Sequence, residues 1–262
     1  MREYEVFPKK RLSQNFMIDD HALELLCSYA AVRQSDIVLE VGAGFGFLTH
    51  ILAQRSRKVI AVEVDARLVK ALQHELACFD NIELIAGNIL KTILPSFNKV
   101  VSNPPFSISS SLLFFLLDKG FDYAVVTFQK EFAQRLGASV GSKDYSRLTV
   151  STYYRVDVEL LDCVPKRAFY PPPTVDAVIV RLKPKKRPPF HVKNEKVFDE
   201  LIRILFTQRN RKVRKAILPF LHKYRSENRA STEIADRLPF CSRRVRELAP
   251  EEFGVLANEL SS

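Results

Sequence analysis

The feature that most constrains the fold is a glycine-rich turn that joins an apolar stretch to an amphipathic one. Residues 38–49 read Val-Leu-Glu-Val-Gly-Ala-Gly-Phe-Gly-Phe-Leu-Thr. The branched residues before the turn are typical of a buried strand, and Phe47–Arg55 has a helical pattern. Because glycine permits positive φ angles and carries no side chain, a ligand can lie directly against Gly42 and Gly44. The order of strand, Gly-x-Gly-x-Gly turn and helix predicts an α/β fold with a ligand site at this turn.

The first two-thirds of the chain alternates short apolar runs with longer amphipathic ones. Runs rich in Val, Ile and aromatic residues predict strands over Ile37–Val41, Lys58–Val64, Ile82–Ile85, Lys99–Ser102, Tyr123–Phe128, Tyr154–Leu161 and Val175–Leu182. Helices are expected over Phe47–Arg55, Ala66–Cys78, Ile108–Lys119 and Lys130–Leu136. This alternation predicts βαβ units and a mostly parallel, seven-stranded sheet. The last two strands lack a long helix between them, which favours an antiparallel hairpin at the sheet edge.

The composition changes near residue 183. Residues 183–189 read Lys-Pro-Lys-Lys-Arg-Pro-Pro, which suits a linker. Helical patterns follow over Val197–Leu205, Asn210–Tyr224, Ser231–Asp236 and Pro250–Leu260. We therefore expect an α/β domain over residues 1–183 and a small all-helical domain over residues 184–262. The second holds 18 Lys and Arg against 10 Asp and Glu, whereas the first holds 22 against 20. A polyanionic partner of the C-terminal domain or a solvated basic surface accounts for this asymmetry.

Several classes of protein and site are excluded by composition. The four cysteines are scattered and the five histidines have no ligand spacing, so we expect neither a disulfide framework nor a metal site. The longest purely apolar run, Leu112–Leu117, is too short to span a bilayer. The N-terminus lacks the apolar core of a signal peptide. We expect a cytoplasmic protein in a reducing compartment, acting as a monomer with no membrane partner.

Polar side chains lie at or just after the carboxyl ends of the first three predicted strands. Glu40 precedes the glycine turn, where its carboxylate can contact a cationic amino-acid group directly or through water. Glu63 ends the second strand, where a carboxylate can bind both ribose hydroxyls of a nucleoside, whereas the neighbouring Asp65 suits a helix N-cap. NAD shares the ribose requirement, but the glycine spacing and Glu40 favour S-adenosylmethionine. Asn88 follows the third strand and either contacts the cofactor adenine or belongs to an ordinary turn.

The most specific motif is Asn103-Pro104-Pro105-Phe106, directly after the fourth predicted strand. An adenine amine is a poor nucleophile because its nitrogen lone pair is delocalised into the ring. The side-chain carbonyl of Asn103 and the backbone carbonyl of Pro104 can accept hydrogen bonds from this amine and stabilise the positive charge that develops on nitrogen. Phe106 can stack on a flipped-out base. Together with the glycine turn, the motif predicts methylation of an adenine amine, the alternative being a proline-rich turn.

These motifs resemble those of the small-subunit ribosomal RNA adenine dimethyltransferase family over nearly the whole chain. The matching segments are residues 9–19, 129–136, 143–148, 169–176, 206–212 and, loosely, 246–253. The resemblance implies a Rossmann-like S-adenosylmethionine-dependent methyltransferase domain and the small helical domain. It also implies two adjacent N6,N6-dimethyladenosines near the 3′ end of the rRNA, made in a pre-ribosomal small subunit. The cofactor contacts implied by the family are Asn15, Met17, Gly42, Glu63, Asn88 and Asn103.

The sequence departs from the family pattern in three segments. Ser13 replaces a glycine and Asn88 replaces an aspartate, and Asn-Pro-Pro-Phe at residues 103–106 replaces the more usual Asn-Leu-Pro-Tyr or Asn-Ile-Pro-Tyr. Because Asn-Pro-Pro-Phe is also the form seen in many DNA adenine methyltransferases, an adenine N6 methyltransferase of large-subunit rRNA or DNA is an open alternative. A non-catalytic ribosome-assembly factor that kept the fold is another.

A basic run in the second domain is the candidate RNA-binding surface. It consists of Arg209, Arg211, Lys212, Arg214 and Lys215, five cations within seven residues. On the helix expected over Asn210–Tyr224 these side chains would form a phosphate-binding face. Such a face suits recognition of RNA by shape and backbone. A solvated helix face is the alternative.

Overall fold

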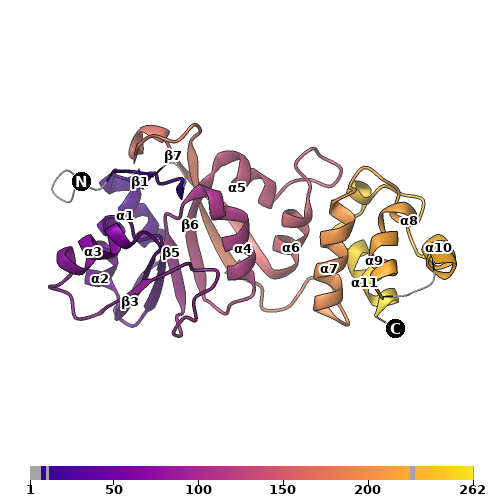
Figure 1. Cartoon of the computed structure of the whole chain (residues 1–262), viewed down its shortest axis with the longest axis horizontal. Helices are drawn as coiled ribbons and strands as arrows, with labels where there is room; N and C mark the ends of the chain where they lie inside the picture. Colours follow the sequence, from indigo (N-terminus) through magenta and orange to yellow (C-terminus); the bar gives the residue numbers. More distant parts are fainter. Residues whose placement is uncertain (1–6, 10–11, 225–227, 262) are drawn as a thin grey trace. The chain divides into compact units, whose positions relative to one another are not determined.

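The computed structural model describes residues 7–9, 12–224 and 228–261. Contacts divide the chain into two compact units, whose course is shown in Figure 1. One unit runs to Ala133 and resumes over Asp157–Pro184, and the other comprises Gln134–Val156 and the residues from Lys185 onward. The segment Gln134–Val156, which the sequence analysis left in the α/β domain, therefore groups with the helical unit. Lys10 and Arg11 of the N-terminal motif lie outside the described residues.

The first unit is built on a seven-stranded sheet with the order β4-β3-β2-β5-β6-β9-β7. The strands are β2 (Ile37–Val41), β3 (Lys58–Glu63), β4 (Ile82–Ala86), β5 (Lys99–Ser102), β6 (Tyr123–Gln129), β7 (Val156–Val164) and β9 (Ala177–Pro184). The first five pair in parallel, and β9 is antiparallel to β6. The predicted Rossmann-like, mostly parallel sheet is thereby confirmed, with β7 and β9 as neighbours at its edge.

The strand order reverses between β2 and β5, which are neighbours in the sheet. Open α/β sheets bind ligands outside the carboxyl ends of their strands at such a reversal. The glycine turn follows β2 and Asn103 follows β5. The topology therefore brings the two sharpest motifs of the sequence to one place.

Helices flank this sheet and a short second sheet lies beside it (Figure 1). The helices are α1 (Asp20–Tyr29), α2 (Phe47–Arg55), α3 (Ala66–Glu75), α4 (Ser109–Leu117) and α5 (Lys130–Leu136), with short 3-10 turns over Phe106–Ile108 and Lys166–Ala168. Leu26 of α1 and Leu52 of α2 pack with Val38 and Val59 in one buried cluster. The short sheet pairs β1 (Phe16–Met17) with β8 (Phe169–Tyr170) in antiparallel register. It ties the N-terminal segment to the segment that precedes β9.

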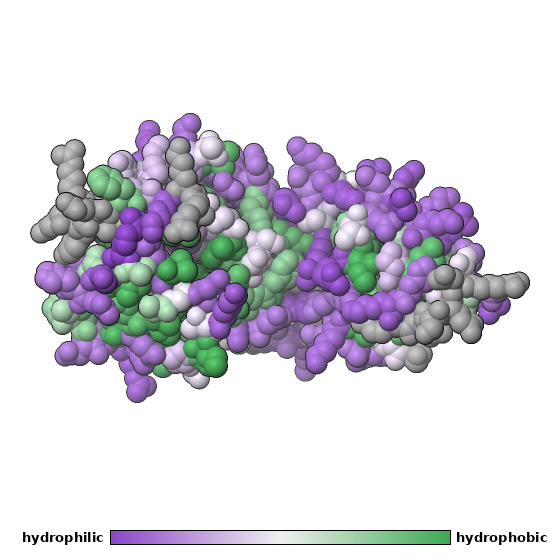
Figure 2. All heavy atoms as spheres, in the orientation of Figure 1, coloured by the Kyte–Doolittle hydropathy of each residue, from purple (hydrophilic) through white to green (hydrophobic). Residues whose placement is uncertain are grey.

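The second unit is helical, as expected. It contains α6 (Arg147–Arg155), α7 (Glu195–Phe206), α8 (Val213–Ala216), α9 (Leu218–Tyr224), α10 (Asn228–Arg237) and α11 (Pro250–Leu260), with a 3-10 turn over Val245–Glu247. Phe198, Leu201 and Phe253 are fully buried in its core. Hydrophilic residues dominate the visible face of this unit in Figure 2. Across the described residues, no helix has the length and apolarity needed to cross a membrane.

Two expectations for secondary structure were wrong. Tyr154 and Arg155 end α6 and do not begin a strand, because they are held within the helical unit. The Tyr154 ring packs on Phe198 with centroids 5.0 Å apart, and Arg155 forms an ion pair with Asp199 at 2.7 Å. The helix expected over Asn210–Tyr224 is divided. Residues 207–210 form turns, Lys212 pairs with Arg244 in an isolated bridge, and α8 stops before α9. Pro219 has no N–H with which to continue the ladder from α8.

Candidate active site

The glycine turn owes its residue types to close approaches of neighbouring segments. Gly42 and Gly44 have φ angles of +76° and +62°, which L side chains rarely adopt. A Cβ atom on Gly42 would lie 3.0 Å from Cδ of Pro105, and one on Gly44 would lie 3.0 Å from Cδ1 of Phe16. The turn is thus enclosed by the Asn-Pro-Pro-Phe loop and by β1.

A cavity lies at this turn and collects most of the predicted cofactor residues. Those that line it are Asn15, Met17, Glu40, Gly42, Gly44, Glu63 and Asn103. Apolar side chains, including Leu23, Phe45 and Phe47, complete the lining. Polar groups therefore converge on a mostly apolar cavity, as in cofactor sites generally.

Glu40 contributes a buried carboxyl group to the lining of this cavity. Its side chain is buried, and Oε2 has no hydrogen-bond partner among the described residues. Burial raises the pKa of the Glu40 carboxyl to about 8. Because a buried carboxylate is costly without a partner, the arrangement fits a cationic group in the cavity.

Glu63 connects the end of β3 to the glycine turn. Its Oε2 accepts a hydrogen bond from the N–H of Gly44 at 3.0 Å, and its Oε1 accepts from the N–H groups of Val64 and Asp65, both at 2.8 Å. Burial raises the pKa of the carboxyl against the effect of these donors. A carboxylate has about four acceptor positions, so Oε2 keeps room for a ribose hydroxyl.

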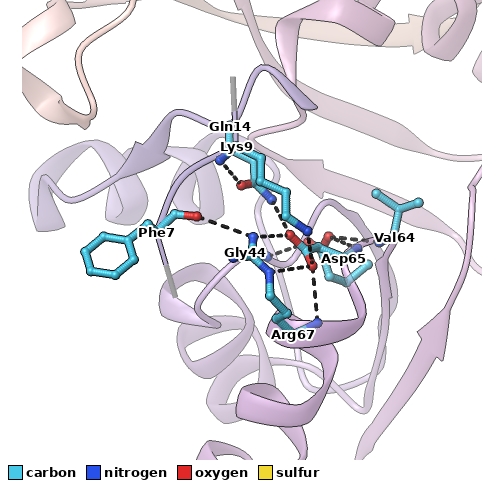
Figure 3. A network of polar contacts seen from close by, with 8 residues as sticks. Phe7, Lys9, Gln14, Gly44, Val64, Asp65 and Arg67 are labelled. Atoms are coloured by element: carbon cyan, nitrogen blue, oxygen red, sulfur yellow. Dashed lines mark hydrogen bonds and ion pairs between the residues drawn. The ribbon is translucent and has the colours of Figure 1, made fainter. Parts of the chain in front are cut away.

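Asp65 fastens the N-terminal segment over the cavity (Figure 3). It caps α3 by accepting from the N–H of Arg67, which confirms the N-cap interpretation. Its carboxylate also pairs with the Arg67 guanidinium at 2.7 Å and with Lys9 at 3.3 Å, and it accepts from Nε2 of Gln14 at 3.3 Å. The Arg67 contact is the main reason why the pKa of Asp65 lies well below its usual range.

Asn103 is held at both ends of its amide. Oγ1 of Thr127 lies 2.5 Å from Oδ1, and Nδ2 donates to the carbonyl oxygen of Asn15 at 3.4 Å. Pro104 is buried and packs against Gly42. A Cβ atom on Gly42 would lie 3.8 Å from Cα of Pro104. Pro104 is not among the residues that line the cavity, whereas Pro105 is.

Phe106 belongs to a second cavity that adjoins the first. Gln14 and Asn15 line both cavities, and Phe106 and Tyr170 contribute aromatic rings to the second. The edge of Phe106 meets Phe169 of β8 at a centroid distance of 6.0 Å. The other lining residues are Pro8, Ser13, Ser107, Gln129, Pro171, Pro172, Pro173 and Thr174. Aromatic faces beside a polar edge suit a planar base.

Asn88 lines neither cavity. It is exposed after β4, and its Oδ1 accepts a hydrogen bond from the N–H of Leu90 at 3.0 Å, as in an ordinary turn. The preceding Gly87 donates its N–H to the carbonyl oxygen of Glu63 at 2.8 Å. Asn88 thus lies near the Glu63 end of the sheet without facing the cavity.

The basic run does not form the expected helix face. Arg209 lies in the turn after α7, and its guanidinium donates to the carbonyl oxygens of Lys143 and Ser142 at 2.7 and 2.6 Å. Backbone hydrogen bonds instead join the run to residues 243–246. The N–H of Val213 donates to Arg243 at 2.9 Å, and the N–H of Arg246 donates to Arg209 at 3.0 Å. A second basic segment, far along the chain, thereby lies beside the first.

Four residues of the site were not predicted from the sequence: Gln14, Thr127, Gln129 and Tyr170. Gln14, Gln129 and Tyr170 lie within family-like segments, so these motifs carried a signal. Thr127 lies within an apolar strand and no pattern singles it out. Among the described residues, no group of three or more His, Cys, Asp and Glu side chains is arranged to hold a metal ion.

Comparison with known proteins relates the chain to a family of ribosomal RNA methylases. The profile of the family described as ribosomal RNA adenine dimethylase matches residues 8–255. A Methanopyrus kandleri protein named probable ribosomal RNA small subunit methyltransferase A is 42% identical over 263 residues, covering 99% of this chain and 95% of its own. A Pyrococcus abyssi protein of the same name is 38% identical, covering 96% and 91%.

Two solved structures resemble the chain along almost its full length. A dimethyladenosine transferase from Plasmodium falciparum superposes with a TM-score of 0.79 at 30% identity, covering 94% of this chain and 97% of its own. The 23S rRNA methyltransferase ErmE superposes with a TM-score of 0.66 at 28% identity, covering 95% and 100%.

Proposed function

The chain belongs to the ribosomal RNA adenine dimethylase family, and on this premise we propose its substrate, cofactor and site. It transfers methyl groups from S-adenosylmethionine to the N6 amines of two adjacent adenosines near the 3′ end of small-subunit rRNA, in a pre-ribosomal particle. The main support for this proposal is a pair of adjoining cavities. They share Gln14 and Asn15, and the loop that begins at Asn103 runs from one to the other. One cavity takes the cofactor and the other takes the flipped base.

The first cavity fits the cofactor because its carboxyl groups can pair with the cationic and hydrogen-bond-donating groups of S-adenosylmethionine. The unpaired Oε2 of Glu40 would hold the cationic amino-acid end, and Oε2 of Glu63 would accept from a ribose hydroxyl. Gly42 and Gly44 leave bare backbone for the ligand. S-adenosylmethionine supplies a methyl group on a cationic sulfur. The residues of the chain position that group toward the second cavity.

Asn103 lines the first cavity and begins the loop that leads to Phe106 in the second, and from there it would act on the amine of the base. Its Oδ1, together with the backbone carbonyl of Pro104, accepts hydrogen bonds from the adenine amine and stabilises the charge that develops on nitrogen. Phe106 stacks on the base and keeps it out of the helix. After methyl transfer the cationic amine loses its proton to water readily, so no buried base is required.

The basic surface of the helical unit supports an RNA partner. Arg211, Lys212, Lys215 and Arg246 come from the two segments joined by backbone hydrogen bonds, and none forms an ion pair with a described residue. Arg211, Lys212 and Lys215 are exposed, and Arg246 is half-buried. Cations that have no acidic partner are available to contact phosphates. Phosphate contacts supply most of the non-specific affinity of proteins for nucleic acids.

The test of the proposed target is methyl transfer to three purified acceptors in parallel. Unmethylated small ribosomal subunits, large subunits and DNA receive labelled S-adenosylmethionine, and their nucleosides are then separated. Dimethyladenosine in the small subunit alone is the expected result. Labelling confined to large subunits or DNA would refute the target, and labelling of large subunits would favour the alternative that the likeness to ErmE supports. Particles halted at successive assembly stages would identify the form that is methylated.

A further inference from the structure

A hydrogen bond between two neighbouring strands holds a residue of the first cavity, Asn103. Thr127 lies near the carboxyl end of β6, and Asn103 directly follows β5. Ser102 pairs with Val126 in parallel register, so the next residue on each strand lies beside the other. Oγ1 of Thr127 is 2.5 Å from Oδ1 of Asn103, and Thr127 has no exposed surface.

The direction of this hydrogen bond follows from the other end of the amide. The carbonyl oxygen of Asn15 can only accept, so the Asn103 atom that faces it at 3.4 Å must be the nitrogen Nδ2. Oδ1 then faces Thr127, and the threonine hydroxyl must donate. A carbonyl oxygen has two lone pairs. One is occupied by Thr127, and the other is free for an N–H of the substrate.

We infer that Thr127 is a positioning residue for methyl transfer, whose hydroxyl fixes the rotation of the Asn103 amide so that Oδ1 meets the adenine amine. The inference rests on the role proposed above for Asn103. The terminal torsion of asparagine is broad. Among the described residues, Nδ2 has a single hydrogen bond, the long one of 3.4 Å to Asn15. Loss of the hydroxyl would let the amide turn and present a donor to the amine. Catalysis depends on acceptors held in place before the reaction.

The test compares Thr127→Val, which keeps the side-chain volume and removes the hydroxyl, with Thr127→Ser, which keeps the hydroxyl. The loss of one hydrogen bond corresponds to about a tenfold fall in kcat for Thr127→Val. We expect the cofactor Kd of Thr127→Val to stay within about twofold, because Thr127 does not line the first cavity. Thr127→Ser should restore most of kcat. A kcat of Thr127→Val equal to that of the wild type would overturn the inference.

A matched control separates positioning from general loss of a buried hydroxyl. Ser102 is the residue before Asn103, and its buried hydroxyl donates to the carbonyl oxygen of Val41 at 2.7 Å. Ser102→Ala removes this hydroxyl and leaves the hydrogen bond between Thr127 and Asn103 in place. It should lower the melting temperature and leave kcat near the wild-type value. An equal fall in kcat for Ser102→Ala and Thr127→Val would assign the effect to the fold and overturn the inference.

A double-mutant cycle tests whether Thr127 acts through Asn103. In an Asn103→Ala background, Thr127→Val should cause no further fall in kcat. An undiminished further fall would overturn the inference and leave the role of Asn103 intact. If Asn103→Ala alone retained kcat, the proposed role of Asn103 would fail, and the inference with it. The two failures are therefore distinguishable.

Discussion

At the residue scale, Glu40, Glu63 and Asp65 are three carboxyl groups at one edge of the sheet with different surroundings. Asp65 is surrounded by Arg67, Lys9 and Gln14, and these contacts keep it ionised. Glu63 accepts three backbone hydrogen bonds, and Glu40 keeps an unpaired oxygen. The differences suit Asp65 to a structural contact and leave the other two for a ligand.

The pH dependence of cofactor binding should report on Glu40. Its pKa of about 8 in the free protein means that much of the carboxyl is protonated at pH 7. A cationic ligand binds the ionised form, so binding releases a proton and the affinity falls as the pH is lowered below about 8. Calorimetry of S-adenosylmethionine binding between pH 6 and 8 should show Kd decreasing as pH rises. Glu40→Gln should bind more weakly with a flatter profile, and a wild-type profile in this variant would contradict the contact.

The sequence predicted most of these residues because strand ends and glycine turns are local patterns. Glu40, Glu63 and Asn103 were found from their positions beside strands, and the structure brings all three to one cavity. Thr127 was not predicted from the sequence, because its contact with Asn103 depends on the register between β5 and β6. Asn88 was placed by the same rule of strand ends, but its side chain is used in a local turn.

At the element scale, the two-stranded sheet of β1 and β8 connects the two cavities. Phe16 and Met17 of β1 line the first cavity and pair with Tyr170 and Phe169 of β8. Tyr170 in turn lines the second cavity. Asp65 anchors the segment that precedes β1 through Lys9 and Gln14 (Figure 3). The N-terminal segment is thus part of both cavities.

Weakening the Asp65 anchor should loosen the first cavity. Asp65→Asn keeps an N-cap acceptor for α3 and removes the charge that pairs with Lys9 and Arg67. The cofactor Kd should rise by about two- to fivefold, the scale of partly exposed ion pairs, with kcat at saturation little changed. Asp19→Asn is the matched control, since Asp19 caps α1 and lines neither cavity. A rise in Kd of the same size in the control would refute the anchoring role.

Elements with strong local patterns were predicted with the correct ends, and elements held by packing were not. α2, α5 and α11 begin and end where expected. α6 reads Arg-Leu-Thr-Val-Ser-Thr-Tyr-Tyr-Arg, a composition typical of strands. Burial of six of its residues, together with the Thr149 hydroxyl bonded to the carbonyl oxygen of Arg135 at 2.8 Å, favours the helix instead. Tertiary contacts of this kind are not visible in a local window.

At the scale of the whole molecule, the proposed chemistry and the proposed nucleic-acid binding fall on different units. Both cavities are lined by residues of the α/β unit, and the free cations described above belong to the helical unit. The excess of positive charge in the last third of the chain therefore lies in the helical unit. RNA affinity and methyl transfer should therefore respond to different sets of substitutions.

Neutralising the basic surface should change the salt dependence of RNA binding. Replacing Arg211, Lys212, Lys215 and Arg246 by Gln should reduce the slope of log K against log salt by about 0.7–0.9 for each phosphate that the protein no longer neutralises. The control is the pair Arg203→Gln and Lys223→Gln, because both cations already pair with Glu200 in the same unit. An unchanged slope in the fourfold variant would show that these cations do not contact phosphate.

The central claim is that Asn103 handles the amine of the base while separate residues hold the cofactor. The most direct test is Asn103→Ala, assayed on unmethylated small ribosomal subunits for kcat and by calorimetry for the cofactor Kd. Removal of an acceptor that acts in the transition state should lower kcat by about 100-fold or more, with a much smaller change in Kd. A variant in which kcat falls no further than cofactor affinity would contradict the claim and place Asn103 in the cofactor site alone.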